Sequence, residues 1–374
     1  MKPERSFALL LPVLSAFLLA SCGPSDAADA PESTAPPTFQ SDPSWPVDIP
    51  AHWVNGPGTG VWVDGQDHVW VLHRPERITD VDMDSVSALR ADVPECCVKA
   101  QPLYELGTDG RIIQTVGSIE KSDEWPFFPH SVFLDHNDNL WIASQPHHVI
   151  MKLTRDGKHL LSIGEFDKTE GSASTTLLGG PADMFVDAEA NELFVADGYQ
   201  NARVVVFDAE TGAYKRHWGA YGVVPDDDYV RDSTSTEPPK QFNLVHGLNI
   251  SKDGLVYVTD ASNSRLQVFR KNGEFIAEAV VDPANSAGGR MTDVAFSGDP
   301  EQSFVYLADG TSHKIWILRR SDLTVVGAFG EPGTGPGQFG RPHNIATDSH
   351  GNIYVAEAHP GRRWQKLTAV QPTP

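Results

Sequence analysis

The chain has 374 residues, 40% of them hydrophobic, and a formal net charge of −21. This length allows a sizeable buried core, either as one large β-architecture or as two ordinary domains. The acidic excess argues against a nucleic-acid-binding surface, which needs clustered Lys and Arg, and charge alone names no other partner.

The first 21 residues are expected to be a signal peptide. Two basic residues precede an apolar run from Phe7 to Ala20, which is too short to span a bilayer but suits a signal h-region. The run ends in LASC, which resembles the lipobox of bacterial lipoproteins, so cleavage would leave Cys22 as a lipid-modified N-terminus. An ordinary secretion signal that happens to contain a cysteine is the alternative. Gly23 in place of Asp favours lipid anchoring at the outer membrane.

Residues 22–48 are rich in Pro, Ser, Ala and Asp and predict a flexible tether. From residue 49 to residue 374 the chain repeats an apolar segment, a polar turn and another apolar segment. The six copies are GVWVDGQDHVWVLH, SVFLDHNDNLWIAS, DMFVDAEANELFVAD, GLNISKDGLVYVTD, DVAFSGDPEQSFVYLAD and NIATDSHGNIYVAEA. Period-two alternation indicates strands, and no segment is a convincing amphipathic helix. Repeats of roughly 40 to 50 residues with four strands each predict an all-β fold, a six-bladed β-propeller.

The longest gap between repeats follows the first copy and predicts an insertion from about Pro75 to Pro102. It contains Cys96 and Cys97, which are expected to form a vicinal disulfide in an oxidising cell envelope. Paired thiols that bind a soft metal are the alternative. A β-sandwich would not explain such regular units, and the segment GTGPGQFGRPHNIA resembles the inter-blade joint of NHL-type propellers.

One position of the repeat carries histidine in every second copy. Five places before the end of the innermost strand, the six repeats have Thr59, His130, Ala182, His246, Thr292 and His343. Alternate blades are related by about 120° around a channel lined by the innermost strands, so the three imidazoles are expected to meet at the axis. Three histidines with an open fourth position are the ligand set of a catalytic zinc site; coincidental packing is the alternative. The histidines outside this register are predicted to be loop residues: His52, His147, His148 and His359.

Polar residues occupy the next position of some repeats. Asp183 and Asp293 are predicted to accept backbone N–H bonds at the channel mouth, a structural role preferred here to a catalytic one. Asn344, together with backbone carbonyls near Val61 and Val132, offers oxygen ligands at the same level and predicts a calcium site.

The segments WVLHR, PHS, ADGYQNAR, VHG and RPHNIA, in this order, resemble the peptidyl-α-hydroxyglycine α-amidating lyase family. The resemblance extends from about Val61 to Leu367. Proteins of that family are six-bladed propellers that cleave peptidyl-α-hydroxyglycine to a peptide amide and glyoxylate, using zinc and a structural calcium ion. The resemblance implies a lyase that acts on a peptide or small-molecule substrate, with His130, His246 and His343 as zinc ligands.

The resemblance also implies that Tyr199 is the catalytic base and that Arg74 faces the polar end of the substrate. A tyrosinate beside Zn²⁺ and an arginine would have a lowered pKa and accept the hydroxyl proton. Two positions depart from the family. Asn344 stands where the family has a calcium-binding Asp, and Ala261 stands where it has an Arg. Arg341 is the candidate to replace that missing cation.

Two further functions are compatible with the same fold, because propellers host both enzymes and scaffolds. One is a non-catalytic, membrane-tethered propeller that binds a protein or another ligand. The other is a lactonase-like sugar-ester hydrolase, which would be expected to use acidic metal ligands rather than histidines. In each case the chain is expected to be a monomer.

Overall fold

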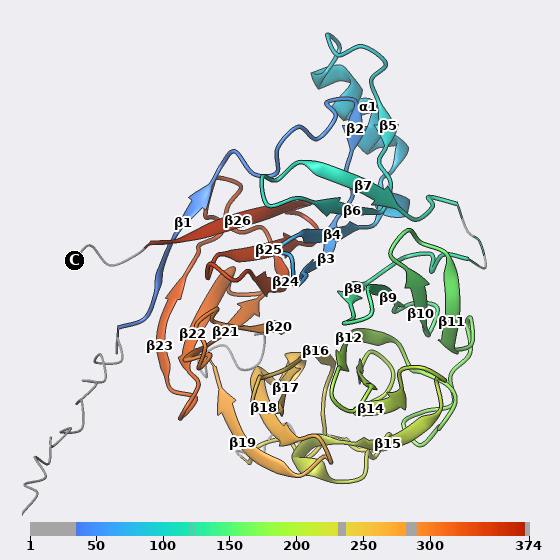
Figure 1. Ribbon diagram of the computed structural model, residues 1–374, viewed down its shortest axis with the longest axis vertical. Coiled ribbons are helices and arrows are strands. Elements are labelled where there is room, and N and C mark those ends of the chain that lie inside the picture. Colours follow the sequence, from blue (N-terminus) through green and yellow to red (C-terminus); the bar gives the residue numbers. More distant parts are fainter. Residues whose placement is uncertain (1–34, 121, 123, 231–236, 282–289, 371–374) are drawn as a thin grey trace, which may run out of the picture. The chain divides into compact units, whose positions relative to one another are not determined.

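The computed structural model describes residues 35–120, 122, 124–230, 237–281 and 290–370. From Pro36 onward, the described residues form six four-stranded antiparallel sheets arranged around a central axis (Figure 1). The first strand of each sheet contacts the first strands of both neighbouring sheets, so these six strands form a closed ring. The predicted all-β, six-bladed propeller is confirmed.

Each blade runs from an inner strand at the axis to an outer strand at the rim. The inner strands are β3 (Gly58–Val63), β8 (Ser131–Leu134), β12 (Pro181–Asp187), β16 (Val245–Ile250), β20 (Met291–Phe296) and β24 (Pro342–Thr347). The second strands are β4 (Val69–His73), β9 (Asn139–Ser144), β13 (Glu192–Asp197), β17 (Leu255–Asp260), β21 (Phe304–Asp309) and β25 (Ile353–Glu357). The third strands are β6 (Leu103–Leu106), β10 (Val149–Thr154), β14 (Arg203–Asp208), β18 (Arg265–Arg270), β22 (Lys314–Arg319) and β26 (Arg363–Val370). The outer strands are β7 (Ile112–Val116), β11 (His159–Gly164), β15 (Tyr214–Trp218), β19 (Phe275–Val280), β23 (Val325–Phe329) and β1 (Thr38–Asp42).

The sixth blade is closed by a strand from the other end of the chain. β1 pairs antiparallel with β26, from Thr38 opposite Val370 to Asp42 opposite Lys366. Phe39 of β1 also packs against the rings of Tyr306 and Phe329 in the fifth blade. Part of the predicted tether over residues 22–48 is therefore a paired strand, and the propeller begins before residue 49. A five-residue edge strand buries little, so its Pro- and Ser-rich surroundings conceal it in the sequence.

The predicted signal peptide and Cys22 lie outside the described residues. Among the residues that are described, none belongs to a helix long and apolar enough to cross a membrane.

In three blades, a buried carboxylate at the end of the second strand holds the loop that leads into the inner strand. Asp197 forms an ion pair with Arg203 at 2.9 Å and accepts a hydrogen bond from the backbone N–H of Gly179 at 2.7 Å. Asp260 and Glu357 make the equivalent contacts in the fourth and sixth blades. The loops that lead into β12, β16 and β24 are held in this way. Paired buried charges of this kind are costly to break, so the channel residues that follow these loops are rigidly placed.

The predicted insertion lies between β4 and β6 and projects at the top of Figure 1. It contains η1 (Pro75–Arg77), α1 (Asp80–Leu89) and β5 (Val98–Lys99), which pairs in parallel with β2 (Trp53–Val54). The helix α1 begins with a capping box between Thr79 and Asp82. None of its residues is buried, so it has no apolar face that hydrophobic periodicity could reveal. Two further helical turns among the described residues are η2 (Ala220–Gly222) and η3 (Ala261–Asn263).

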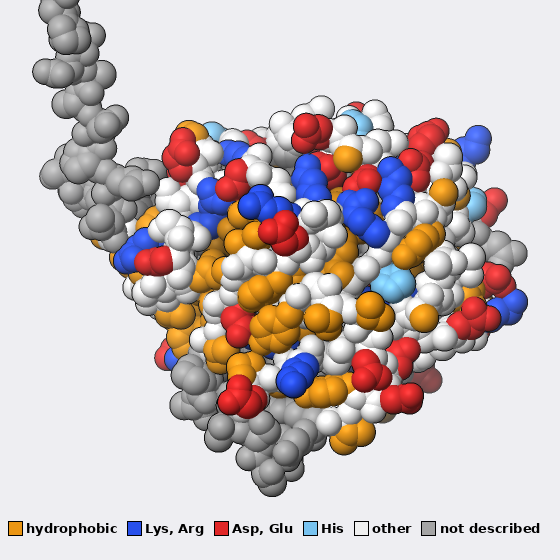
Figure 2. Space-filling view, turned by 90° about the horizontal axis from the view of Figure 1, so that it is seen from below, with side chains coloured by type: hydrophobic (Ala, Val, Ile, Leu, Met, Phe, Trp, Pro, Cys, Tyr) orange, Lys and Arg blue, Asp and Glu red, His pale blue; other side chains and the backbone are white. Residues whose placement is uncertain are grey.

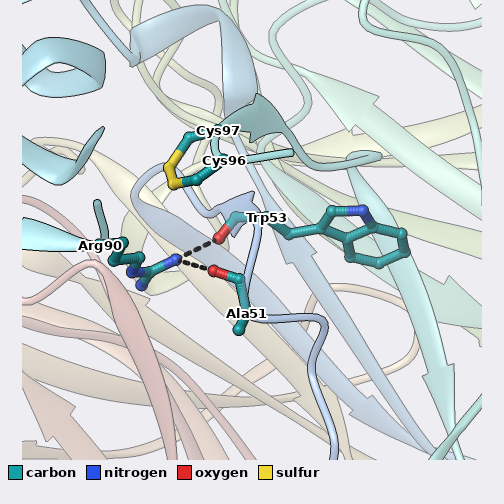
Figure 3. The surroundings of a disulfide bond; sticks show 5 residues. All are labelled: Ala51, Trp53, Arg90, Cys96 and Cys97. Atoms are coloured by element: carbon teal, nitrogen blue, oxygen red, sulfur yellow. Dashed lines mark hydrogen bonds between the residues drawn. A yellow bond between two sulfur atoms is a disulfide. The ribbon is translucent and has the colours of Figure 1, made fainter. Parts of the chain in front are cut away.

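Cys96 and Cys97 are joined by a disulfide in this insertion, as expected from the sequence (Figure 3). Beside it, Arg90 donates hydrogen bonds to the backbone carbonyls of Ala51 and Trp53 at 2.7 and 2.9 Å. The arginine and the β2–β5 pair thus attach the insertion to the segment that precedes the first blade.

Replacing both cysteines with Ser is expected to leave the metal content of the purified protein unchanged. The disulfide joins two adjacent residues and contributes no ligand to the histidine cluster described below, so the change should at most loosen the turn that they form and slightly lower the melting temperature. Metal analysis and thermal unfolding of the double variant check this. Loss of metal from that variant would mean that the ligands have been assigned to the wrong residues.

Candidate metal centre

The inner strands are irregular at one equivalent point near their start. The pairing register with the second strand shifts around this position, leaving the following residues unpaired: Thr59, Ala182, His246, Thr292 and His343. In the second blade, His130 directly precedes β8 and its backbone N–H bonds to the carbonyl of Ala143 at 2.7 Å. A bulge leaves a residue out of the ladder and changes the direction of its side chain. The register position that carries the alternating histidines is therefore a bulge position.

The three histidines meet at the axis, as the repeat register predicts. Their side chains offer ligand atoms that all lie within 4.8 Å of one another. The centroids of the His130, His246 and His343 rings are 4.8 to 5.0 Å apart, so the rings form a nearly equilateral triangle. All three side chains are buried.

A backbone carbonyl of the following blade fixes the tautomer of each histidine. The Nδ1 atom of His130 lies 2.7 Å from the carbonyl oxygen of Ala182. The Nδ1 atom of His246 lies 2.6 Å from that of Thr292, and the Nδ1 atom of His343 lies 2.8 Å from that of Thr59. A carbonyl oxygen only accepts, so Nδ1 carries the proton and the lone pair is on Nε2. The three Nε2 atoms are thus available as ligands.

Burial also keeps these imidazoles neutral. It lowers the pKa of His246 to about 4, and burial together with neighbouring charges lowers the pKa of His130 and of His343 well below the usual value. Neutral imidazole is the form that binds metal ions. Three neutral, convergent and orientated Nε2 donors fit a zinc site that keeps a fourth position for water or substrate.

Tyr199 places its hydroxyl beside these donors. The oxygen is 3.0 Å from His130 Nε2 and 3.2 Å from His246 Nε2. The residue lies in the loop after β13, where its backbone approaches Gly180. A Cβ on Gly180 would come within 2.7 Å of the Tyr199 Cβ, and the φ of Gly180 is +88°, so glycine is required there. Burial of the hydroxyl raises the pKa of Tyr199, while the charges of Arg74, Arg341 and Arg290 act in the opposite direction. The arginines alone therefore do not lower the pKa of Tyr199 in the way that the sequence predicts.

Arg74 lies between the metal centre and the insertion. Its Nε donates a hydrogen bond to the carbonyl of Pro129, the residue before His130, at 2.7 Å. Its Nη2 atom is buried and has no hydrogen-bond partner among the described residues. Burial lowers its pKa to about 10, Tyr199 opposes this effect and Arg77 adds to it. An unpartnered guanidinium nitrogen inside a cavity is suited to an anionic group of a ligand.

A cavity of about 380 Å³ opens above the triad. It is lined by Pro57, Thr59, Arg74, Arg77, His130, Tyr199, Arg341, His343, Ala358, His359 and Arg362. The structure therefore brings together Arg74, Tyr199 and Arg341, as predicted, with two of the three histidines. Ala261 is buried in η3 and does not line the cavity, so its position supplies no cation here.

Three polar lining residues are not predicted from the sequence to belong to the site: Arg77, Arg362 and His359. His359 lies in a loop, as predicted, but that loop follows β25 and reaches the cavity. The repeat alignment compares only inner strands, whereas these three residues belong to the insertion and to the loop after a second strand. By contrast, His147 contacts Asp167 at 2.6 Å, and His52, His147 and His148 do not line the cavity.

The next position of the inner strands carries hydrogen bonds between blades. Asp183 accepts one from the backbone N–H of Leu248 at 3.0 Å, and Asp293 accepts one from Ile345 at 2.8 Å. The backbone N–H bonds predicted for these two aspartates are present. Asp293 also accepts a hydrogen bond from the side-chain amide of Asn344 at 2.6 Å.

The predicted calcium ligands do not fit that ion as a set. The amide oxygen of Asn344 already accepts a hydrogen bond from the backbone N–H of Val61 at 2.6 Å, and its nitrogen donates to Asp293. Calcium usually takes six to eight oxygen ligands, with carboxylates among them. Asn344, Val61 and Val132 bring a single neutral side-chain oxygen. Asn344 acts instead as a link between the sixth and first blades.

A second cluster of possible ligands, Asp64, His68 and Glu105, lies near the first hairpin. The guanidinium of Arg155 occupies it, pairing with Asp64 at 2.9 Å and with Glu105. A cation of the chain itself therefore neutralises these carboxylates, and the cluster is a structural ion-pair network.

Comparison with known proteins agrees with this architecture. The NHL repeat family matches residues 242–269. The chain is 25% identical over 342 residues to peptidyl-glycine alpha-amidating monooxygenase B of Xenopus laevis, covering 87% of this chain and 35% of that protein. It is 27% identical over 325 residues to peptidyl-alpha-hydroxyglycine alpha-amidating lyase 2 of Drosophila melanogaster, covering 84% of this chain and 71% of that one. It thus spans about a third of the Xenopus protein and most of the Drosophila protein.

Among solved structures, virginiamycin B lyase of Staphylococcus aureus superimposes with a TM-score of 0.51 at 13% identity, covering 89% of this chain and 99% of that one. At this identity the likeness shows the fold alone. The chain is thus a six-bladed propeller with an NHL repeat, and it is similar over most of its length to proteins named as peptidyl-α-hydroxyglycine α-amidating lyases.

Proposed function

We propose that the protein is a zinc-dependent lyase that cleaves the C–N bond of peptidyl-α-hydroxyglycine or a similar N-acyl-α-hydroxyglycine. One observation carries the proposal. Three convergent Nε2 donors, the Tyr199 hydroxyl and the unpartnered Nη2 of Arg74 belong to one site. A scaffold propeller has no need of this combination, and a lactonase would be expected to show acidic ligands. The similarity to named amidating lyases supports the same reaction.

The residues of the site divide the chemistry between them. His130, His246 and His343 would hold zinc, which as a Lewis acid would polarise the substrate oxygen and favour deprotonated Tyr199. Tyr199 accepts the proton of the substrate α-hydroxyl, and the O–H electron pair forms the new C=O bond. The C–N bond breaks with its electron pair going to nitrogen, and the nitrogen takes up the proton that Tyr199 received, so the products are a primary amide and glyoxylate. Arg74 and Arg341 orient the carboxylate that leaves with glyoxylate.

Two measurements on the purified protein test the proposal together: metal content and release of glyoxylate from α-hydroxyglycine peptides. We expect one zinc per chain, and activity that a chelator removes and added zinc restores. Metal-free protein that releases no glyoxylate under any metal supplementation would favour the scaffold function.

We further propose that the protein is lipid-anchored in a bacterial envelope through Cys22. Replacing Cys22 with Ala is expected to move the protein from the membrane fraction to the soluble fraction, because a protein anchored by acyl chains loses its attachment with them. Fractionation of cells that express each form measures this. Replacing the neighbouring Ser21 with Ala leaves the cysteine in place and is the control. Unchanged membrane association of the Cys22 variant would contradict the anchor.

A further inference from the structure

The cavity above the metal centre has a charge opposite to that of the molecule. The described residues that line it include four arginines and no Asp or Glu, although the chain carries a net charge of −21. On the face shown in Figure 2, on the side of β15 and β19 in Figure 1, acidic and basic side chains are interspersed. The concentration of one sign in the cavity is therefore a local feature, and a cleft of this kind attracts anions.

The rim of the cavity holds more positive charge than one carboxylate requires. Arg74 and Arg341 are assigned above to the carboxylate of the hydroxyglycine end. Arg77 is exposed at the rim and forms no ion pair with any described residue. Its guanidinium lies over the ring of Phe128, 5.2 Å from the centroid. Stacking holds this charge in place without neutralising it.

The insertion sets the position of a second rim arginine. Arg362 lines the cavity and also a neighbouring cavity of about 490 Å³ beside α1. It forms an ion pair with Asp82 of α1 at 2.7 Å, which balances part of its charge. Because only one nitrogen of Arg362 is in that contact, its other guanidinium N–H groups stay available to a ligand. The insertion thus contributes Arg77 directly and orients Arg362 through Asp82.

We infer that Arg77 and Arg362 form a second anion subsite, and that preferred substrates carry a second carboxylate on the acyl side of the scissile C–N bond. This inference rests on the proposed lyase function. The buried Nη2 of Arg74 places the first carboxylate deep in the cavity, so a group bound at the exposed Arg77 belongs to the other end of the substrate. Acidic peptides or N-dicarboxylyl-α-hydroxyglycines meet this requirement.

The test compares two acyl groups of similar length in binding and in turnover. Zinc-loaded protein is titrated by calorimetry with N-succinylglycine and with N-pentanoylglycine, which lack the reactive hydroxyl. The corresponding α-hydroxyglycines are then compared by kcat/KM for glyoxylate release. We expect a preference of roughly tenfold for the succinyl compounds, falling as ionic strength rises. Arg77→Gln and Arg362→Gln should each reduce this ratio, and the double variant should bring it close to one. Arg319→Gln, which removes an exposed arginine paired with Asp322 in the fifth blade, is the control for loss of one charge.

The outcomes separate this inference from the function on which it rests. Equal binding of the two acylglycines, or a preference that survives in the double variant, would overturn the subsite. Glyoxylate release at equal rates from both substrates would leave the lyase function standing and also overturn the subsite. Charge-selective binding that the double variant abolishes, with no glyoxylate from either substrate, would support the subsite and reject the lyase function.

Discussion

Replacement of any one of His130, His246 and His343 by Ala is expected to remove most of the bound zinc and nearly all activity. Two remaining protein ligands do not hold the tetrahedral geometry of the metal. Because the three act as a unit, double variants should be scarcely worse than single ones. Metal analysis of each purified variant, together with glyoxylate release, measures the effect.

The controls for this experiment follow from the partners of the histidines. Each His→Ala change also leaves a buried carbonyl without its N–H donor, at a cost of about 1–3 kcal/mol. Unfolding of the metal-free proteins separates that loss from loss of the ligand. The backbone carbonyls of Thr59 and Thr292 accept hydrogen bonds from His343 and His246. Thr59→Ser and Thr292→Ser leave these carbonyls in place, so both variants should retain the zinc. Three His→Ala variants that retain their metal would show that the alternating register has no metal-binding role.

Tyr199→Phe is expected to keep the zinc and the substrate affinity while kcat falls by a factor on the order of a hundred or more. Phenylalanine preserves the ring at the cavity but cannot accept the hydroxyl proton, and a positioned proton acceptor contributes roughly this much. The Tyr199 hydroxyl contacts the Nε2 atoms of His130 and His246, which are the atoms that would bind the metal. The hydroxyl does not hold these rings in place through Nδ1, so its removal does not weaken their binding of the metal.

A matched control for this variant lies in the third blade. The hydroxyl of Tyr214 is 2.9 Å from His217 Nδ1, a similar Tyr–His contact outside the cavity. Tyr214→Phe should leave kcat unchanged. Loss of zinc from Tyr199→Phe would mean that the hydroxyl helps to position the histidine ligands. If it kept full turnover, another group would have to be the base.

The parts of the fold that could be predicted are those that repeat. His130, His246 and His343 lie at one level of the channel because they occupy the same position in the inner strands of three blades that share one geometry. The position of Tyr199 came from resemblance to a family, since one tyrosine in a turn has no periodicity.

The remaining features depend on contacts between distant segments, which leave no local pattern. β1 is recognisable only through its pairing with β26, at the other end of the chain. Arg362 reaches the cavity rim beside Asp82, 280 residues earlier in the sequence. The helix α1 has no buried face, so its capping box was its only local signal. The sequence also does not reveal that the amide of Asn344, a predicted calcium ligand, forms hydrogen bonds with Val61 and Asp293.

The channel side chains have a consequence for the propeller as a whole, because they link each blade to the next around a complete circuit. The links are Arg74 to Pro129, His130 to Ala182, Asp183 to Leu248, His246 to Thr292, Asp293 to Ile345, and His343 to Thr59. Three of these six links are made by the same imidazoles that would hold zinc. Binding of a metal ion by the three imidazoles and closure of the ring of blades are therefore thermodynamically linked. Metal binding would slow the separation of blades, and loosening at any blade boundary would speed the escape of the metal.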